Sequence, residues 1–366
     1  MNEPPDIEND EEGTKPPHRR RARYSGTHPR QFHERYKEHD PQAYPEEHEH
    51  IRTRGRTPAG THVPIMVDEV LRLLDPRAGE MAADCTLGYG GHGEALLRRL
   101  APGGRLVGFD VDGEQLQRTA DRLRGLNIDA AVSVRRSNFA GLAKSLAAEG
   151  IDGYDVIFAD LGVSSMQIDD PLRGFSYKHD GPLDMRMDSR LKRTAADVLA
   201  DMSADDLAAA LVELADEEDA AAIAGEIGRR RSSRPIRRTL ELADAVLTAK
   251  GMSPRDWKRA KSAEPGLQHP AARTFQALRM LVNDELGSLT ALLREAPWCL
   301  RPAGRIGVLS FHSGEDRLVK HAFADGLRGG MYSAIADEVV RPSAAEVASN
   351  PRSRPAKFRW AVRAGA

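Results

Sequence analysis

The chain has 366 residues, of which 40% are hydrophobic and 5% aromatic. This length fits two domains, or one domain with a large insert, and the composition suits an α/β core. The formal net charge of −2 excludes a polycationic chain, so any nucleic-acid site must be a local basic patch. Cys85 and Cys299 lie far apart without metal-ligand spacing, and no apolar run reaches the roughly 18 residues of a membrane span. We therefore expect a cytoplasmic protein without a disulfide framework, a metal site or a membrane contact.

Residues 1–60 differ in kind from the rest of the chain. They combine an acidic start, the basic run HRRRAR at 18–23 and repeated prolines with almost no aliphatic side chains. Such a segment cannot bury enough apolar surface to offset the entropy lost on ordering. The composition therefore predicts a disordered N-terminal tail.

From residue 62 onward, strand-like and helix-like segments alternate. Strands are expected within 80–88, 105–112, 130–139, 155–165 and 304–313, and helices over 94–100 and 113–126. This alternation predicts an α/β protein with a parallel, doubly wound sheet. Residues 357–364 are expected to form an antiparallel edge strand.

The segment 170–268 has another character. It is rich in alanine and leucine and carries capping-box patterns at Thr194–Asp197 and Ser203–Asp206. We interpret it as an all-helical domain inserted into the sheet domain. The sheet domain would then comprise 61–169 and 269–366, resuming with a long helix near 269–286.

The stretch DCTLGYGGHG at 84–93 is the first candidate site. Its glycines at 88, 90 and 93 have the G-x-G-x-x-G spacing of a dinucleotide-binding turn, but S-adenosylmethionine enzymes carry similar turns, and a simple tight turn is a further alternative. The turn follows a strand, where a doubly wound sheet binds its ligand. Asp110 ends the next strand, where its carboxylate can accept hydrogen bonds from both ribose hydroxyls of an adenosine.

Three acids favour S-adenosylmethionine over a dinucleotide. Asp84 at the end of the first strand and Glu94 after the turn would both repel a pyrophosphate. Asp84 is instead expected to meet the charged methionine end. Asp160 ends the fourth strand, in DLGVSS, where amino-methyltransferases place an acidic or polar acceptor for the target amine.

Several longer segments resemble the bacterial small-subunit ribosomal RNA methyltransferase H family. The matching segments are HVPIMVDEVL (62–71), DCTLGYGGHG (84–93), DLGVSSMQIDDPLRGFSYKHDGPLDMRMD (160–188), HPAARTFQALRMLVNDEL (269–286), SFHSGEDRLVK (310–320) and NPRSRPAKFR (350–359). The chain departs from the family at LADEEDAAAIAGEI (214–227), where Tyr-Gly-Glu-Glu is usual, and at Gly314, where leucine is usual. The first departure puts in doubt any role carried over to the inserted segment.

The resemblance implies a Rossmann-like class I methyltransferase sheet with S-adenosyl-L-methionine as cofactor. It implies N(4)-methylation of a cytidine of 16S rRNA in the decoding region, with the rRNA, within the small ribosomal subunit, as partner. The cofactor contacts that it implies are Gly90, Gly91, His92, Asp110, Phe139, Asp160 and Gln167. Without the family, Phe139 is equally well a core residue and His92 a packing residue at a helix start.

Asp160 is our candidate catalytic residue, as an acceptor for the target amine; binding the cofactor alone is its rival role. The segment RGFSYKHDGPLDMRMD is expected to form the wall of the base pocket, with Phe175 and Tyr177 as stacking surfaces and Arg173 and Arg186 as phosphate contacts. The alternative is a packed connector to the inserted segment.

Three further points remain open at this stage. Six arginines between Arg229 and Arg238 form either a phosphate-binding patch or a solvated helix end. In SFHS, His312 lies near the pocket or Ser313 caps a helix with Asp316. The alternatives to an rRNA methyltransferase are a DNA amino-methyltransferase, which would flip its base out of a duplex, and a non-catalytic ribosome-assembly factor.

Overall fold

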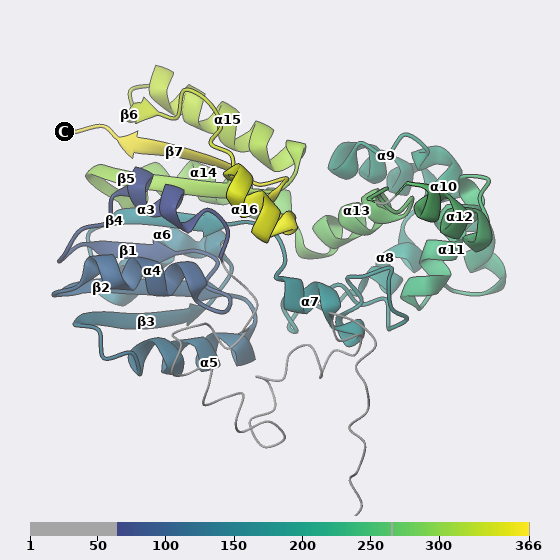
Figure 1. Cartoon of the computed structure of the whole chain (residues 1–366), viewed down its shortest axis with the longest axis horizontal. Coiled ribbons are helices and arrows are strands. Elements are labelled where there is room, and N and C mark those ends of the chain that lie inside the picture. Colours follow the sequence, from purple (N-terminus) through teal and green to yellow (C-terminus); the bar gives the residue numbers. More distant parts are fainter. Residues whose placement is uncertain (1–63, 265, 366) are drawn as a thin grey trace, which may run out of the picture.

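The computed structural model of the chain describes residues 64–264 and 266–365 (Figure 1). The tail expected over residues 1–60 lies outside these residues. Within them, seven strands form one sheet in the order β3-β2-β1-β4-β5-β7-β6. The strands are β1 (Met81–Asp84), β2 (Gly104–Asp110), β3 (Ala130–Arg136), β4 (Tyr154–Asp160), β5 (Leu300–Ser310), β6 (Tyr332–Ile335) and β7 (Lys357–Arg363).

Strands β1 to β5 run parallel to one another, and β7 runs antiparallel to both of its neighbours, β5 and β6. The strand order reverses at β1, which lies between β2 and β4, so the carboxyl ends of these strands form the switch point of the sheet. The predicted α/β fold is confirmed. The prediction that residues 357–364 form the edge is wrong, because β6 covers the outer side of β7; with four residues, β6 is too short to give a clear strand pattern.

Helices cover both faces of the sheet, as the alternation along its strands requires. Ala82, Leu106 and Val156 face one layer of helices, α3 (Val67–Leu74), α4 (Gly91–Leu100) and α5 (Gly113–Arg124). Their neighbours Ala83, Val107 and Ile157 face the other layer, which contains α6 (Leu142–Glu149), α14 (Glu285–Cys299) and α15 (Ser313–Arg328). Neighbouring residues of one strand thus enter two separate cores.

A second, helical unit lies beside the sheet (Figure 1). It contains α8 (Ala195–Asp201), α9 (Ala204–Ala215), α10 (Ala220–Ser233), α11 (Thr239–Ala249), α12 (Pro254–Ala263) and α13 (Ala272–Asn283). The predicted caps are present, since Thr194 and Ser203 accept hydrogen bonds from the backbone of Asp197 and Asp206.

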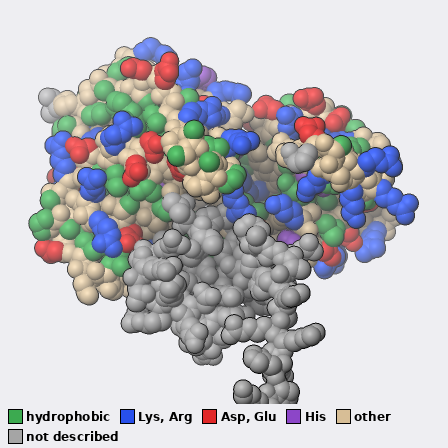
Figure 2. Space-filling view, in the orientation of Figure 1, with side chains coloured by type: hydrophobic (Ala, Val, Ile, Leu, Met, Phe, Trp, Pro, Cys, Tyr) green, Lys and Arg blue, Asp and Glu red, His purple; other side chains and the backbone are tan. Residues whose placement is uncertain are grey.

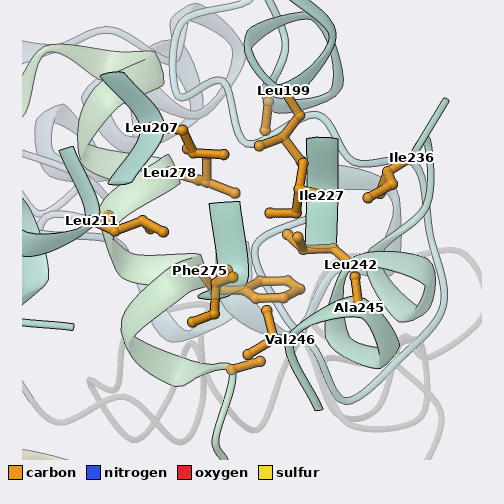
Figure 3. Close-up of a cluster of buried hydrophobic side chains, with 14 of the residues drawn as sticks. Leu199, Leu207, Leu211, Ile227, Ile236, Leu242, Ala245, Val246, Phe275 and Leu278 are labelled. Atoms are coloured by element: carbon orange, nitrogen blue, oxygen red, sulfur yellow. The ribbon is translucent and has the colours of Figure 1, made fainter. Parts of the chain in front are cut away.

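The helical unit has its own apolar core, which differs from expectation in one respect. We expected the sheet domain to resume at residue 269, but α13 packs against α9 and supplies Phe275 and Leu278 to the helical core (Figure 3). The core of the helical unit therefore needs the helix that leads back to the sheet.

The segment between β4 and α8 joins the two units. It contains the short helix α7 (Ser165–Asp169) and the 3-10 turn η3 (Pro171–Arg173). Near the C-terminus, α16 (Ala344–Ser349) and the 3-10 turn η4 (Pro351–Ser353) precede β7. Among the described residues, no helix combines the length and the apolar character that crossing a membrane requires.

Candidate functional site

A cavity of about 1000 Å³ opens at the carboxyl ends of β1, β2 and β4 and extends to α13 and α15. Figure 2 shows the surface hollowed between the sheet and the helical unit, with basic side chains at its border. All seven predicted cofactor-binding residues line this one cavity: Gly90, Gly91, His92, Asp110, Phe139, Asp160 and Gln167. They lie at or shortly after the carboxyl ends of β1, β2, β3 and β4, which only the folded sheet brings together.

The glycine turn between β1 and α4 is held in place by its neighbours. The backbone N–H of Gly88 donates to Asp110 Oδ2 at 2.8 Å, and Thr119 of α5 donates its hydroxyl to the Gly88 carbonyl at 2.6 Å. The Arg122 guanidinium donates to the carbonyls of Tyr89 and Gly90. These contacts fix a turn whose residues 88–92 face the cavity.

Asp110 couples the glycine turn to the end of β2. Its second carboxylate oxygen accepts from the Asp112 N–H at 2.9 Å. Burial raises the pKa of Asp110, while the hydrogen bonds from Asp112 and Gly88 act in the opposite direction. The carboxylate thus organises the turn and also lines the cavity where a ribose is predicted.

Asp84 does not reach the cavity, contrary to expectation. It is 1% exposed, Oδ1 accepts from the Thr86 N–H, and Oδ2 has no hydrogen-bond partner among the described residues. Burial, opposed by hydrogen bonds from Thr86 and reinforced by the charge of Asp110, raises the pKa of Asp84 to about 7. The Asp84 carboxyl therefore lies beneath the turn. It is not placed for the predicted direct contact with the methionine end of the cofactor.

Asp160 closes the floor of the cavity at the end of β4. Its backbone N–H donates to Thr86 Oγ1 at 2.6 Å, and its Oδ1 is buried without a hydrogen-bond partner among the described residues. Burial, together with the negative charges of Asp84 and Glu315, raises the pKa of Asp160 to about 8. An acid placed in this way gains from a cationic ligand or a hydrogen-bond donor in the cavity.

His92, at the start of α4, packs between the cavity and the sheet. Its Nε2 lies 2.9 Å from the carbonyl oxygen of Ile65, its Nδ1 lies 3.5 Å from Asp160 Oδ2, and its ring is 4.7 Å from that of Phe158. Burial lowers the pKa of His92 to about 4. His92 therefore packs against the sheet, as one interpretation expected, and also lines the cavity, as the other expected.

Phe139 and Gln167 approach the cavity from the ends of β3 and β4. Phe139 opens the 3-10 turn η2 (Phe139–Gly141) and is half-buried. Gln167 belongs to α7 and forms a capping box with Ser164, whose N–H donates to its side-chain oxygen at 3.1 Å. Their contacts with a cofactor remain predictions.

Of the four predicted substrate residues, only Tyr177 lines the cavity; Phe175, Arg173 and Arg186 do not. Tyr177 lines the cavity, and its ring stacks on His269 at 4.4 Å. Phe175 is 8% exposed within the helical core, so its ring is not available for stacking, and this prediction is corrected.

Arg173 and Arg186 are held by acids of the protein itself. Arg173 donates to Asp112 Oδ2 at 3.0 Å, which joins the connector to the start of α5. Arg186 makes two hydrogen bonds of 2.7 Å to Asp184. Neither residue lines the cavity, and any phosphate contact by them requires a change of partner.

The far wall of the cavity contains His312, which one of the two interpretations of SFHS placed near the pocket, and Arg279 and Glu285, to which the sequence assigned no role. Arg279 of α13 binds both carboxylate oxygens of Glu285, at 2.8 and 2.9 Å. His312 lies 3.0 Å from Glu315 Oε1. The sequence contains these residues in the segments TFQALRMLVNDEL and SFHSGEDR. Neither segment shows by its spacing that α13 and α15 meet at one cavity.

His312, and not Ser313, caps α15. Its Nδ1 accepts from the backbone N–H of Glu315, whereas the Ser313 hydroxyl donates to Asp216 of the helical unit at 3.3 Å. The predicted Ser313 cap with Asp316 is therefore wrong. Histidine is an unusual capping residue, so the pattern gave no reason to prefer His312.

The arginine run is largely paired within the helical unit. Arg230 bonds to Glu226 and Asp244, and Arg231 donates to backbone carbonyls at the C-terminal end of α8. Arg234 and Arg238 pair with acids but stay well exposed, at 81% and 50% of their side chains. Arg229 is also exposed, at 75% of its side chain, so the exposed arginines lie at both ends of the run.

Comparisons with known proteins agree over most of the chain. A family model described as the MraW methylase family matches residues 59–364. "Ribosomal RNA small subunit methyltransferase H 1" of Lachnoclostridium phytofermentans is 41% identical over 358 residues, which cover 96% of this chain and 95% of that protein. "Ribosomal RNA small subunit methyltransferase H" of Rubrobacter xylanophilus is 42% identical over 322 residues, which cover 83% of this chain and 96% of that protein.

Proposed function

This chain belongs to the MraW methylase family, and we propose that it transfers a methyl group to the exocyclic N4 amine of a cytidine in 16S rRNA. The methyl donor is S-adenosyl-L-methionine. The observation that carries the proposal is the convergence of the seven predicted cofactor residues, Asp160 among them, on one cavity.

The cavity fits this cofactor chemically. Its volume of about 1000 Å³ lies at the upper end of the range for small-molecule sites. The Oδ1 of Asp160 is buried and has no partner within the described part of the chain, and together with the carboxyl of Asp110 it suits a cationic, hydroxyl-bearing ligand and would repel a pyrophosphate. In the proposed complex, Asp110 holds the ribose, the glycine turn holds the methionine end and Phe139 lies against the adenine.

Asp160 is the proposed catalytic residue. When bound, S-adenosyl-L-methionine supplies a methyl group already activated by a positively charged sulfur. The cytosine amine is a poor nucleophile because its lone pair is delocalised into the ring, so the protein must orient it and accept a hydrogen bond as positive charge develops. The carboxyl of Asp160 and a backbone carbonyl within residues 161–163 are the acceptors that the cavity offers.

The substrate assignment rests on the relatives and on the cavity wall. The relatives are named as small-subunit ribosomal RNA methyltransferases. Tyr177 offers an aromatic surface in the cavity, as sites for unpaired bases do. Cytidine 1402 in the decoding region is the position that the family resemblance implies, and we propose the small subunit in the cytoplasm as the setting.

Labelled methyl transfer and mass spectrometry of rRNA test this function together. We expect label on naked 16S rRNA or on small subunits, and loss of one N4-methylcytidine in cells without the protein. Label on DNA alone would support the DNA amino-methyltransferase instead. Cofactor binding without any transfer would support a ribosome-assembly factor.

The first prediction concerns Asp110. Asp110→Ala removes two hydrogen bonds to a charged acceptor, each worth about 1.5–3 kcal/mol. We expect calorimetric titration with S-adenosyl-L-methionine to show at least about a tenfold loss of affinity. Asp121→Ala, in the exposed face of α5, is the matched control and should bind normally. Unchanged affinity in the Asp110 variant contradicts the assignment.

The second prediction concerns three exposed arginines at the C-terminal end of the run. If Arg234, Arg237 and Arg238 contact phosphates, replacing all three by alanine weakens RNA binding and lowers its salt dependence, by about 0.7–0.9 in logarithmic slope per lost contact. Filter binding over a range of salt concentrations measures the slope. Arg328→Ala, an exposed arginine at the end of α15, is the control. Equal slopes in the triple variant and the wild type would leave these arginines as a solvated surface.

A further inference from the structure

The hydrogen bonds of His92 determine which of its nitrogens carries the proton. A carbonyl oxygen can only accept, so the 2.9 Å contact with Ile65 requires a hydrogen on Nε2. The ring is 7% exposed and packs on Phe158, and this burial lowers the pKa of His92 to about 4. The ring is therefore neutral near pH 7, and its Nδ1 presents a lone pair toward Asp160.

The surroundings of Asp160 disfavour its ionised form. The distance of 3.5 Å between its Oδ2 and His92 Nδ1 exceeds the roughly 2.7–2.9 Å of a charge-assisted hydrogen bond. Its Oδ1 is buried without a hydrogen-bond partner among the described residues. A carboxylate here would face the lone pair of His92 and have an unsatisfied oxygen.

The other charged groups around Asp160 do not compensate such a carboxylate. Asp84 of β1 and Glu315 of α15 both add negative charge and raise the pKa of Asp160. Four basic side chains line the same cavity: Lys178, Arg279, Arg352 and Arg354. Arg279 is bound through two hydrogen bonds to Glu285, Arg352 pairs with Asp169, and none of the four counteracts the rise in the pKa of Asp160. Protonation of Asp160 relieves the repulsion and gives the Nδ1 side of His92 a donor to face.

We propose that Asp160 carries a proton in the cofactor-free protein and releases it to solvent when S-adenosyl-L-methionine binds. His92 is the positioning residue: the lone pair on its Nδ1 favours the protonated form of Asp160 before the cofactor binds. The carboxyl goes from COOH to COO⁻, and the buffer takes up the proton. The ligand brings a net charge of +1, from its sulfonium, ammonium and carboxylate groups. The inference rests on the proposed function in one respect, that this cofactor occupies this cavity.

The consequence is an ordered activation of the site. Before the cofactor binds, Asp160 is a neutral acid and a poor acceptor for an amine. Once the cation lies in the cavity, the ionised carboxylate is favourable and can accept a hydrogen bond from the target. Binding of the methyl donor thereby ionises the Asp160 carboxyl, which then accepts the hydrogen bond from the target amine.

Titration calorimetry in two buffers of different ionisation enthalpy tests the proposal without any RNA. At pH 7, the wild-type protein should release about one proton per S-adenosyl-L-methionine bound. S-adenosyl-L-homocysteine, which lacks the sulfonium charge, should release clearly less. Binding of S-adenosyl-L-methionine without proton release overturns the inference, whereas failure to bind it at all overturns the proposed cofactor site instead.

Three variants locate the proton. Asp160→Asn should bind without proton release, and Asp84→Asn should keep the release but move its midpoint to lower pH, because one repelling charge is gone. His92→Phe keeps the ring packing but removes the nitrogens, and should also move the midpoint to lower pH. If proton release vanishes only in Asp84→Asn, the released proton belongs to Asp84. If the pH profile of proton release is unchanged in His92→Phe, even with weaker binding, the role of His92 is packing alone. If Asp160→Asn does not bind, the wild-type comparison of the two ligands decides alone.

Discussion

Asp160→Asn is expected to lower the rate of methyl transfer about 10²–10³-fold at saturating cofactor, the usual cost of losing one hydrogen bond made to the transition state. The asparagine keeps the shape of the side chain at the end of β4 but loses the negative charge and weakens the acceptor. Single-turnover transfer to small ribosomal subunits measures the rate, and direct titration measures the affinity for the cofactor. We expect the affinity to change less than the rate, because Asp110 and the glycine turn are intact.

The same strand provides a matched control for this variant. Asp155 lies at the opposite end of β4, where it accepts from the Met81 N–H and pairs with Arg301. Asp155→Asn should lower stability without lowering the rate. If Asp160→Asn instead loses affinity and recovers the full rate at saturation, Asp160 binds the cofactor and is not catalytic. If both quantities stay at wild-type values, the reacting amine must be sought at the far wall of the cavity, near His312.

The residues at the switch point could be predicted from the sequence because each lies at the end of its strand or directly after it. The glycine turn, Asp110 and Asp160 come at the ends of β1, β2 and β4, and parallel strands bring such ends to one edge of the sheet. Local order along the chain is therefore enough to place them together. Asp84 was misjudged because it ends β1 just as Asp110 and Asp160 end their strands, and this position alone does not show that its side chain is buried.

The packing of the helical unit could not be predicted in the same way. The spacing of Phe275 and Leu278 identifies a buried face of α13, but the same apolar face suits a sheet or a helix bundle. Phe175 was expected at a pocket wall because aromatic residues stack on bases, yet it has the same chemistry as a core residue. The periodicity of apolar residues shows that one face of a helix is buried, but it does not show which element packs against that face.

The roles of the arginines depend on partners that are distant in sequence. Arg173 pairs with Asp112, 61 residues away, and Arg238 with Asp180, 58 residues away. A run of basic residues predicts a phosphate site only if no acid of the fold neutralises it. Which arginines are free is thus a property of the tertiary structure.

Gly90→Ala is the second change with a large expected effect, and here the cause is steric. Gly90 has a φ of 74°, which costs a residue with a Cβ about 1–2 kcal/mol. A Cβ at this position would also lie 2.6 Å from Thr119 Cγ2 and 2.9 Å from the Arg122 guanidinium. Both side chains hold the glycine turn through hydrogen bonds, so neither can move freely. Overpacking of this kind typically costs about 1–3 kcal/mol more.

The comparison with Gly150→Ala separates the two contributions. Gly150 ends α6 with a φ of 67°, and a Cβ there would meet nothing within 4 Å. Its replacement should therefore cost only the backbone strain, about 1–2 kcal/mol in the free energy of unfolding, and leave cofactor affinity unchanged. Gly90→Ala should cost about 2–5 kcal/mol and also weaken cofactor binding, because relief of the clash displaces the turn from Thr119 and Arg122. Denaturant unfolding and cofactor titration of both variants measure the difference. Equal losses of stability in the two variants would mean that α5 yields to the new methyl group, and normal cofactor affinity in Gly90→Ala would show that the close fit of the turn against α5 does not determine the shape of the binding site.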